Sequence, residues 1–388
     1  MYQSHYSRFL CAAPNRLHFA AHSHHLWLDV TREAHLQYWD DSAKYADKKW
    51  AYIFSTVIAE AQRHISAILD LSHPEQIVFA PNTHEFVARL FSSLDWSKPV
   101  KILTTDSEFY SFSRQAMRLQ EAMPTYFSVH RVPAEPFESF EARFREAIAR
   151  ERYDMIFFSH VFFNSGFVIS DLDSLVASVP SPETLVVIDG YHGFCAIPTS
   201  LRRIESRVFY LSGGYKYAQS GEGVCFLVVP QSCALRPIFT GWFAELATLA
   251  ESPSHEVTYQ HDGLRFAGAT FDPSGLYRFN AAMRWFAAQR LSVERIHSYV
   301  VRLQEYFLQR LEQEPIRALP LSALRPPRHL TLRGHFLTFE LDNAIELEKQ
   351  LLERDVYIDR RANRLRFGFG LYHTEAEVDA LIERLLTL

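Results

Sequence analysis

Residues 211–230 read "LSGGYKYAQSGEGVCFLVVP", a stretch rich in glycine and small residues in which Lys216 stands between two tyrosines. Glycines let other groups approach the backbone closely, and the apolar run 224–229 predicts a buried strand directly afterwards. We therefore expect Lys216 to be partly enclosed. Enclosure strips water from the ammonium group and lowers its pKa, which an amine needs if it is to form a Schiff base with a carbonyl. A surface lysine in a hairpin turn is the alternative that this stretch leaves open.

Outside this stretch, short apolar runs alternate with segments of helix length. One such segment, 51–69, carries apolar residues at helical spacing. The runs end in polar or turn residues and read "QIVFA" (76–80), "VKILTT" (100–105), "DMIFFSH" (154–160), "TLVVID" (184–189), "RVFYLSG" (207–213) and "VCFLVV" (224–229). This alternation predicts an α/β fold with a mostly parallel sheet between helices. Ligands of such sheets collect at the carboxyl ends of the strands.

The pattern changes beyond about residue 275. A long helical stretch is predicted through Leu311, followed by a proline-rich connection at 319–332. Then come a strand at 335–341, a helix at 344–354, a strand at 364–370 and a last helix from 374, where Thr374 and Glu377 have the spacing of a capping box. We expect a large domain at 46–272, a smaller α+β domain at 273–388, and an N-terminal segment, 1–45, that packs against the small domain and the mouth of the site.

The amino-acid composition is typical of a globular protein. The 388 residues are 48% apolar, enough for a large core. The net charge of -5 gives no basic field for nucleic acid or anionic lipid. Only short apolar stretches occur near the N-terminus, so neither a secretory signal nor a membrane span is expected. The four cysteines have no CxxC pairing, which favours reduced thiols in a cytoplasmic enzyme.

Two strand ends bring an acid and an amine into the same region. The run 184–189 ends at Asp189, and the following turn carries His192. Lys216 comes 27 residues after Asp189, beyond one more strand. An acid and a lysine at neighbouring strand ends suit pyridoxal phosphate, because the lysine can hold the cofactor while the carboxylate keeps the pyridine nitrogen protonated. The charged ring then acts as an electron sink.

Several segments in order over 80–380 resemble the fold-type I pyridoxal phosphate enzymes of aminotransferase class V, most closely kynureninase. The segments are "PNTHEF" (81–86), "SHVFFNSG" (159–166), "DGYH" (189–192), "GGYKYAQSGEG" (213–223), "GWF" (241–243) and "LRFGFGLYHTEAEVD" (365–379). The resemblance implies catalytic roles for Lys216, Asp189 and His192. It implies cofactor contacts for Asn82, Thr83, His84, Phe109, Asp189, His192, Tyr215, Lys216, Trp242 and Thr270.

Each implied contact has a physical reason. Thr83 and His84 would open a helix whose N-terminus suits a phosphate, although an ordinary N-cap at Thr83 is the alternative. Phe109 would stack on the pyridine ring, and core packing is its alternative. Tyr215 and Trp242 would donate hydrogen bonds to phosphate oxygens. Thr270 would reach the partner subunit's phosphate, which implies a homodimer with composite sites.

The resemblance also implies that Arg366 holds the α-carboxylate of an amino acid substrate by a two-pronged contact. Strand alternation puts Arg364 on the same face as Arg366, so spacing alone does not choose between them. The motif favours Arg366. A solvated arginine on an edge strand is the alternative.

Some substrate-side segments depart from the kynureninase pattern. Residues 21–25 read "AHSHH" where that family has "GNSLG", residues 109–112 lack its aspartate, and "RFAGATFDP" lacks its asparagine. We expect His22, Ser23 and His24 to form a substrate-recognising loop, with a plain polar loop as the alternative. A metal site is not expected, because the histidines have no cysteine or carboxylate companion. Kynurenine cleavage is expected to be weak or absent.

The predicted function is that of a lyase that cleaves a C–C or C–S bond in the side chain of an amino acid. A class V aminotransferase is the main alternative, because one cofactor supports either outcome. A cysteine desulfurase is disfavoured, since it would need a nucleophilic cysteine after the lysine and none follows Cys233. A non-catalytic module is disfavoured because Lys216 and Asp189 are both present.

Overall fold

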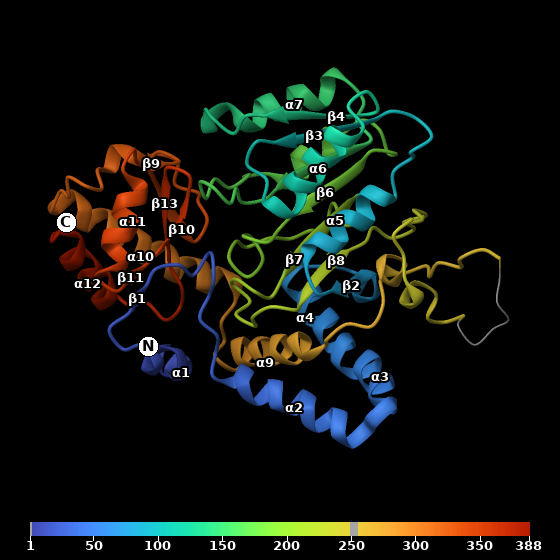
Figure 1. Cartoon of the computed structure of the whole chain (residues 1–388), viewed down its shortest axis with the longest axis horizontal. Coiled ribbons are helices and arrows are strands. Elements are labelled where there is room, and N and C mark those ends of the chain that lie inside the picture. The colour runs from blue at the N-terminus through green and yellow to red at the C-terminus, as the bar shows by residue number, and fades with distance from the viewer. Residues whose placement is uncertain (1, 249–254) are drawn as a thin grey trace.

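The computed structural model describes residues 2–248 and 255–388, and a seven-stranded sheet forms the centre of its larger part (Figure 1). The strand order is β2-β8-β7-β6-β5-β3-β4. β8 is antiparallel to both of its neighbours, and the other adjacent pairs are parallel. The strands are β2 (Ile77–Ala80), β3 (Val100–Thr105), β4 (Phe127–Val132), β5 (Met155–Ser159), β6 (Leu185–Asp189), β7 (Val208–Gly213) and β8 (Cys225–Val228). The predicted mostly parallel sheet is confirmed.

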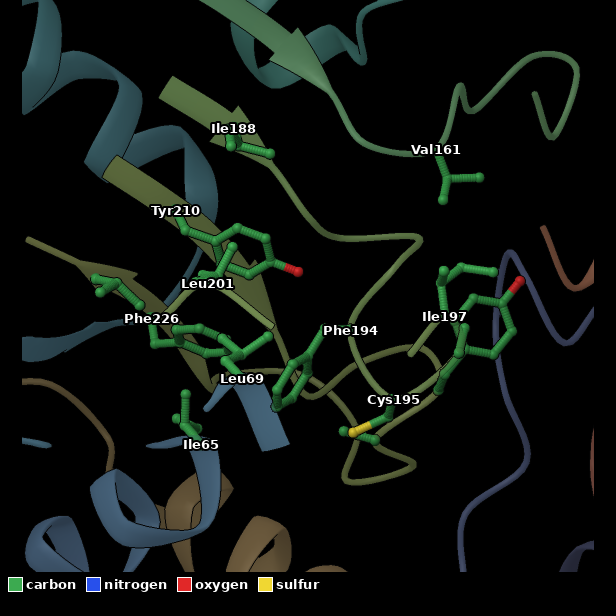
Figure 2. Packing of buried hydrophobic residues seen from close by; sticks show 14 of the residues in the cluster. Ile65, Leu69, Val161, Ile188, Phe194, Cys195, Ile197, Leu201, Tyr210 and Phe226 are labelled. Carbon is green, nitrogen blue, oxygen red and sulfur yellow. The ribbon is translucent and has the colours of Figure 1, made fainter. Parts of the chain in front are cut away.

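Helices cover both faces of this sheet, so its central strands are apolar on both sides. One face packs against α4 (Ala59–Leu69), α7 (Phe140–Arg150), α8 (Leu172–Ala177) and α9 (Ser274–Ala288). The opposite face packs against α5 (Thr83–Ser92) and α6 (Tyr110–Ala122). Figure 2 shows the first face, where Ile188, Tyr210 and Phe226 of three neighbouring strands lie above Ile65 and Leu69 of α4.

The helix predicted over 51–69 is helical throughout but is not one regular α-helix. It runs from α3 (Lys49–Tyr52) through a π-helical segment, Ile53–Ile58, into α4. Before it lie α1 (Ser7–Ala12) and α2 (Val30–Tyr45), of which α2 packs along α9. None of the described helices combines the length and the apolar character needed to cross a membrane.

The smaller part contains a four-stranded antiparallel sheet with the order β12-β13-β10-β9. Its strands are β9 (Leu324–Arg325), β10 (Phe336–Glu340), β12 (Asp359–Arg361) and β13 (Arg364–Gly368). Its helices are α10 (Val293–Gln313), α11 (Ala344–Leu352) and α12 (Glu375–Leu385). The predicted capping box of Thr374 and Glu377 is present at the start of α12.

The long helix predicted from about 275 through Leu311 is two helices, α9 and α10. The chain turns at Arg290, which has a left-handed φ of 53°. Apolar residues of α9 pack against the large sheet, whereas those of α10 from Val300 onward pack in the core of the small sheet. We propose that the boundary between the domains falls at this turn, rather than near residue 272.

The N-terminal segment touches both parts of the molecule. A short strand, β1 (Leu17–His18), pairs in parallel with β11 (Val356–Tyr357). Phe19 is buried in the core of the small sheet. Residues 20–28 then cross toward the large sheet, which brings the "AHSHH" loop between the two parts (Figure 1).

Candidate functional site

The carboxyl ends of β5, β6 and β7 and the start of α5 surround a cavity of about 220 Å³. Ser159 and Asp189 end neighbouring strands in direct register. The residues predicted from the sequence that line this cavity are Asn82, Thr83, Phe109, Asp189, His192, Tyr215 and Lys216. Sequence positions more than a hundred residues apart therefore meet at one edge of the sheet, as the strand-end argument predicts.

Lys216 lies in the turn after β7 and is 9% exposed. Its Nζ contacts His192 Nε2 and lies 5.6 Å from the ring centre of Phe109 and 5.3 Å from that of Tyr191. Burial lowers the pKa of Lys216 well below its ordinary value, and the positive charge of Arg366 lowers it further. Burial therefore favours the neutral form of the amine more than in an exposed lysine, and the low exposure excludes the surface hairpin lysine.

Asp189 is the last residue of β6 and is also 9% exposed. Burial raises its pKa to about 6, although the Tyr191 N–H at 2.9 Å and the nearby Lys216 work in the opposite direction. The carboxyl group is thus mostly ionised at neutral pH, while its affinity for a proton is higher than that of an ordinary aspartate. Such a group can hold a proton on a buried basic nitrogen.

His192 is buried beside Lys216 and carries no charge near neutral pH. Burial lowers its pKa well below the ordinary value, and the charges of Lys216 and Arg366 lower it further. Its Nδ1 is buried and has no hydrogen-bond partner among the described residues. A buried polar atom left without a partner is costly, so this nitrogen is available to a group bound in the cavity.

The start of α5 forms another wall of the cavity. Asn82 is the N-cap, because its side chain accepts a hydrogen bond from the Glu85 N–H at 3.1 Å. Thr83 is therefore not the cap, and its hydroxyl donates to Ser111 Oγ at 3.3 Å. The Tyr215 hydroxyl, also at the cavity, lies 3.1 Å from His24 Nδ1. A helix N-terminus with two hydroxyl groups nearby suits a phosphate.

Arg366 lies in the middle of β13 and is 2% exposed. Its guanidinium donates to the Phe163 carbonyl and to Asp359 on the adjacent strand. Burial lowers its pKa to about 10, and the Asp359 charge opposes that shift. Arg364 is instead bound to Glu340 at 2.8 Å and to Glu135. The structure thus distinguishes Arg366 from Arg364, which strand alternation alone could not do.

The "AHSHH" loop is less polar in its surroundings than its sequence indicates. His22 is fully buried with its ring stacked on Phe336 at 4.6 Å, and His25 is buried as well. Ser23 lies in a turn, where its N–H donates to the Ala20 carbonyl at 2.9 Å. His24 is partly exposed near Tyr215. Over residues 2–248 and 255–388, no group of three or more His, Cys, Asp or Glu is arranged to hold a metal ion.

Three of the cofactor contacts implied by the resemblance do not line the cavity of their own subunit. Arg366 and the predicted substrate-recognising residues 22–24 are not among its lining residues either. Trp242, in a 3-10 helix, is 46% exposed, and His84 is exposed with its Nδ1 2.9 Å from Gln115. His84 and Thr270 line a separate surface hollow of about 550 Å³ together with Gly241. Within one subunit the structure does not bring Trp242 and Thr270 to Lys216.

Sequence reasoning missed two carboxyl groups near the site, of which Glu108 is buried and Asp359 is partly buried. Glu108 accepts hydrogen bonds from Thr105 Oγ1 at 2.6 Å and from Ser159 Oγ at 2.6 Å, and burial raises its pKa to about 8. Asp359 is the partner of Arg366. Glu108 directly precedes Phe109 just after a strand end, and this position could have indicated a role at the site. Asp359 is placed by the pairing register of two short strands, which no sequence pattern reveals.

The residues of the cavity fit pyridoxal phosphate. Lys216 offers a buried amine with a lowered pKa, Asp189 offers a carboxylate for the pyridine nitrogen, and Phe109 provides an aromatic face beside the amine. The start of α5 and Tyr215 offer donors to a phosphate. The unpartnered His192 Nδ1 gives a further polar contact for a bound group.

Several solved structures have a similar fold. A C-DES mutant with glycine covalently linked to the PLP cofactor is 18% identical, with 98% of this protein and 98% of that mutant covered and a TM-score of 0.82. The cystine C–S lyase C-DES in complex with its reaction product, cysteine persulfide, is 17% identical, with coverages of 97% and 99% and a TM-score of 0.79. The apo cysteine desulfurase from Thermococcus onnurineus NA1 is 15% identical, with coverages of 96% and 94% and a TM-score of 0.78.

These structures are C–S lyases and cysteine desulfurases rather than kynureninases, so the resemblance to kynureninase in particular is not confirmed. No curated protein sequence matches the protein. The profile of the aminotransferase class-V family matches residues 28–381, nearly the whole sequence. The chain therefore belongs to the aminotransferase class-V family of pyridoxal phosphate-dependent enzymes.

Proposed function

We propose that this enzyme is a lyase that cleaves the Cβ–S bond of a sulfur-containing amino acid. The observation that carries the proposal is the buried Lys216, which lines the cavity with Asp189 and whose pKa is lowered by the charge of Arg366. An amine can hold the cofactor, a carboxylate can keep the pyridine nitrogen protonated, and a guanidinium can bind the carboxylate of an amino acid. When bound, pyridoxal phosphate supplies the electron sink for charge left at Cα.

The residues of the protein divide the remaining tasks. Thr83 and Tyr215 would hold the phosphate of the cofactor, and Phe109 would lie against its ring. Asp189 would keep the pyridine nitrogen protonated. Lys216 removes the proton from Cα, a role that burial favours because it lowers the pKa of the amine.

The substrate is held from the small domain. Arg366 binds its α-carboxylate and so fixes the orientation of the Cα–H bond toward Lys216. The apolar walls formed by Val161 and Phe163 keep water from the reacting atoms. The overall reaction consumes one water: R–S–CH₂–CH(NH₃⁺)–COO⁻ + H₂O gives RSH, pyruvate and NH₄⁺.

The cysteines favour direct release of the sulfur product over transfer to the enzyme. All four lie among the described residues, and Cys195 and Cys225 are buried. Cys225 lines the cavity, but burial raises the pKa of its thiol to about 12, so it is not a thiolate nucleophile at neutral pH. The similarity to a cystine C–S lyase supports a reaction in which the sulfur leaves with the product.

The test is a substrate panel of L-cystine, L-cysteine, an S-alkyl-L-cysteine and L-kynurenine. We expect pyruvate and ammonia in equal amounts from at least one sulfur amino acid, with the thiol or persulfide product identified by mass spectrometry. Pyruvate is measured with lactate dehydrogenase. Product that forms only when a 2-oxo acid is added would instead identify an aminotransferase, and anthranilate from kynurenine would identify C–C cleavage.

A second experiment tests the role of Lys216 independently of the substrate. Borohydride treatment of the holoenzyme should trap the cofactor on the peptide that contains Lys216, and Lys216→Ala should lose this covalent link. The motivation is the buried amine at the cavity. Cofactor found on any other lysine would contradict the assignment.

We also propose that the enzyme is a cytoplasmic homodimer whose sites are shared between subunits. The support is the position of Thr270 and Trp242 on the surface, away from the cavity of their own subunit. Ile238 and Phe239, 69% and 63% exposed, lie beside the same hollow and add apolar surface. Exposed apolar patches of this kind are typical of protein interfaces.

A further inference from the structure

Arg366 already has an anionic partner before any substrate arrives. Its guanidinium, 2% exposed, is held by Asp359 and by the Phe163 carbonyl. A buried guanidinium without an anion would be costly, so a resting counterion is expected at such a position. A substrate carboxylate must therefore compete with Asp359 for Arg366.

The geometry shows where the displaced carboxylate of Asp359 can turn. Its Oδ1 accepts a hydrogen bond from Arg361 at 2.7 Å, and its Oδ2 is the oxygen that contacts Arg366. The same Oδ2 lies 3.7 Å from His22 Nε2. If Oδ1 stays on Arg361, a small rotation of the carboxyl group moves Oδ2 from Arg366 to His22.

The His22 side chain is free to accept such a partner. It is fully buried, and both of its ring nitrogens lack a hydrogen-bond partner among the described residues. Its ring is fixed against Phe336, and a Cβ at Gly368 would lie 2.1 Å from its Nδ1, so only glycine leaves room for the imidazole there. A fixed, buried imidazole with two unpartnered nitrogens calls for an explanation.

We propose that the substrate α-carboxylate takes the place of Asp359 on Arg366, and that Asp359 then pairs with His22, which takes up one proton from solvent. This inference rests on the proposed function, since it needs an amino acid carboxylate at Arg366. Asp359 and His22 are positioning residues. Asp359 neutralises Arg366 in the empty site, and His22 provides a new partner for the Oδ2 atom when Arg366 is released. The proton returns to solvent when the product leaves.

The charges around His22 set the direction of the effect. Burial lowers the pKa of His22 well below its ordinary value, and Arg366, His192, Lys216 and Arg361 lower it further. Asp359 is the carboxylate at hand. A bound substrate adds a negative charge on Arg366 and frees Asp359 for His22, so both changes raise the pKa of His22. Proton uptake on binding follows wherever the pH lies between the two values.

The test compares glycine with ethylamine, which reacts at the same cofactor but has no carboxylate. Proton uptake by the holoenzyme is measured with an indicator dye in weakly buffered solution between about pH 5.5 and 7. For wild type we expect glycine to draw in about one proton per site more than ethylamine. His22→Gln should abolish this difference. His25→Asn, which removes another buried imidazole from the same loop, should keep it.

Asp359→Asn gives a second, independent readout. Without its resting counterion Arg366 should bind a carboxylate more tightly, so the Kd of glycine should fall by about tenfold, while that of ethylamine should not change. A merely structural role of Asp359 would weaken both ligands alike and would overturn the proposal. So would equal proton uptake in wild type and His22→Gln.

The two proposals fail in different ways. If glycine does not perturb the cofactor spectrum at all, the amino acid substrate class is wrong and both proposals fall. If glycine binds with no proton uptake beyond that of ethylamine, only the exchange between Arg366 and His22 is wrong. Neither result depends on turnover of a sulfur amino acid.

Discussion

Asp189 and Lys216 lie at one cavity because each follows a short apolar run, whereas Arg366 was assigned only through the motif shared with the family. Such runs become strands, and the ends of parallel strands meet at one edge of the sheet. The roles of the carboxyl groups of Asp359 and Glu108 were not predicted. Asp359 faces Arg366 only because β12 and β13 pair in one register. Glu108 is set by a loop that turns its carboxyl group inward to Thr105 and Ser159. Neither arrangement produces a periodic sequence pattern from which it could be predicted.

Glu108 gives a prediction for the pH dependence of stability. Its pKa in the folded protein is about 8, against an ordinary value of 4.5, so the folded state retains a proton that the unfolded state has lost between those values. Its contribution to stability is complete below about pH 4.5 and is lost as the pH rises through 8. Glu108→Gln, which stays neutral, should remove this dependence.

The measurement is urea unfolding of wild type and Glu108→Gln between pH 5 and 8. Wild type should lose up to about 1.4 kcal/mol per pH unit relative to the variant. Asp189 titrates in the same window in both proteins, so its effect largely cancels in the difference. Stability profiles that stay parallel across this range would show that Glu108 is already ionised in the fold.

Among the elements, the largest difference from the prediction is the break between α9 and α10, where the sequence pattern predicted one continuous helix. Many helices end at a residue in the left-handed region, which is usually glycine, and here Arg290 occupies that position. The Leu291 N–H bonds to the Phe286 carbonyl at 2.8 Å and the Arg290 N–H to the Ala287 carbonyl at 3.0 Å, which together form a Schellman motif. The remaining signal was Ser292, which caps α10 by accepting from the Arg295 N–H.

This motif predicts that Arg290→Gly stabilises the protein. A side chain in the left-handed region costs about 1 kcal/mol, part of which glycine gives back through the entropy of the unfolded state. We expect a net gain of about 0.5 kcal/mol in the free energy of unfolding, measured by urea denaturation. Arg290→Ala is the control: it keeps the Cβ and should show no gain. Equal effects of the two substitutions would place the cause in the lost arginine side chain.

At the scale of the whole molecule, the cavity lies at the large sheet while Arg366, Asp359 and His22 come from the small sheet and the N-terminal segment. The hydrophobic pattern of the strands predicted both sheets. This pattern could not predict that residues 20–28 pass between the sheets, because that path depends on the pairing of β1 with β11 and on the burial of Phe19 in the core of the small sheet. Nor does one subunit account for Thr270 and Trp242, which lie apart from the cavity.

A homodimer with shared sites predicts complementation between two damaged subunits. If Thr270 serves the partner's cofactor, a C2 dimer makes this contact twice, and each site combines Lys216 of one subunit with Thr270 of the other. A heterodimer of the Lys216→Ala and Thr270→Ala variants then contains one site with both substitutions and one with neither.

Mixing the two variants after verified subunit exchange should restore up to about a quarter of wild-type activity, because at random exchange half of the dimers are mixed and each has one intact site of two. Thr270→Ala must first be shown to be impaired alone. Activity no higher than the sum of the separate variants, or a stable active monomer in light scattering, would show that each subunit builds its site alone.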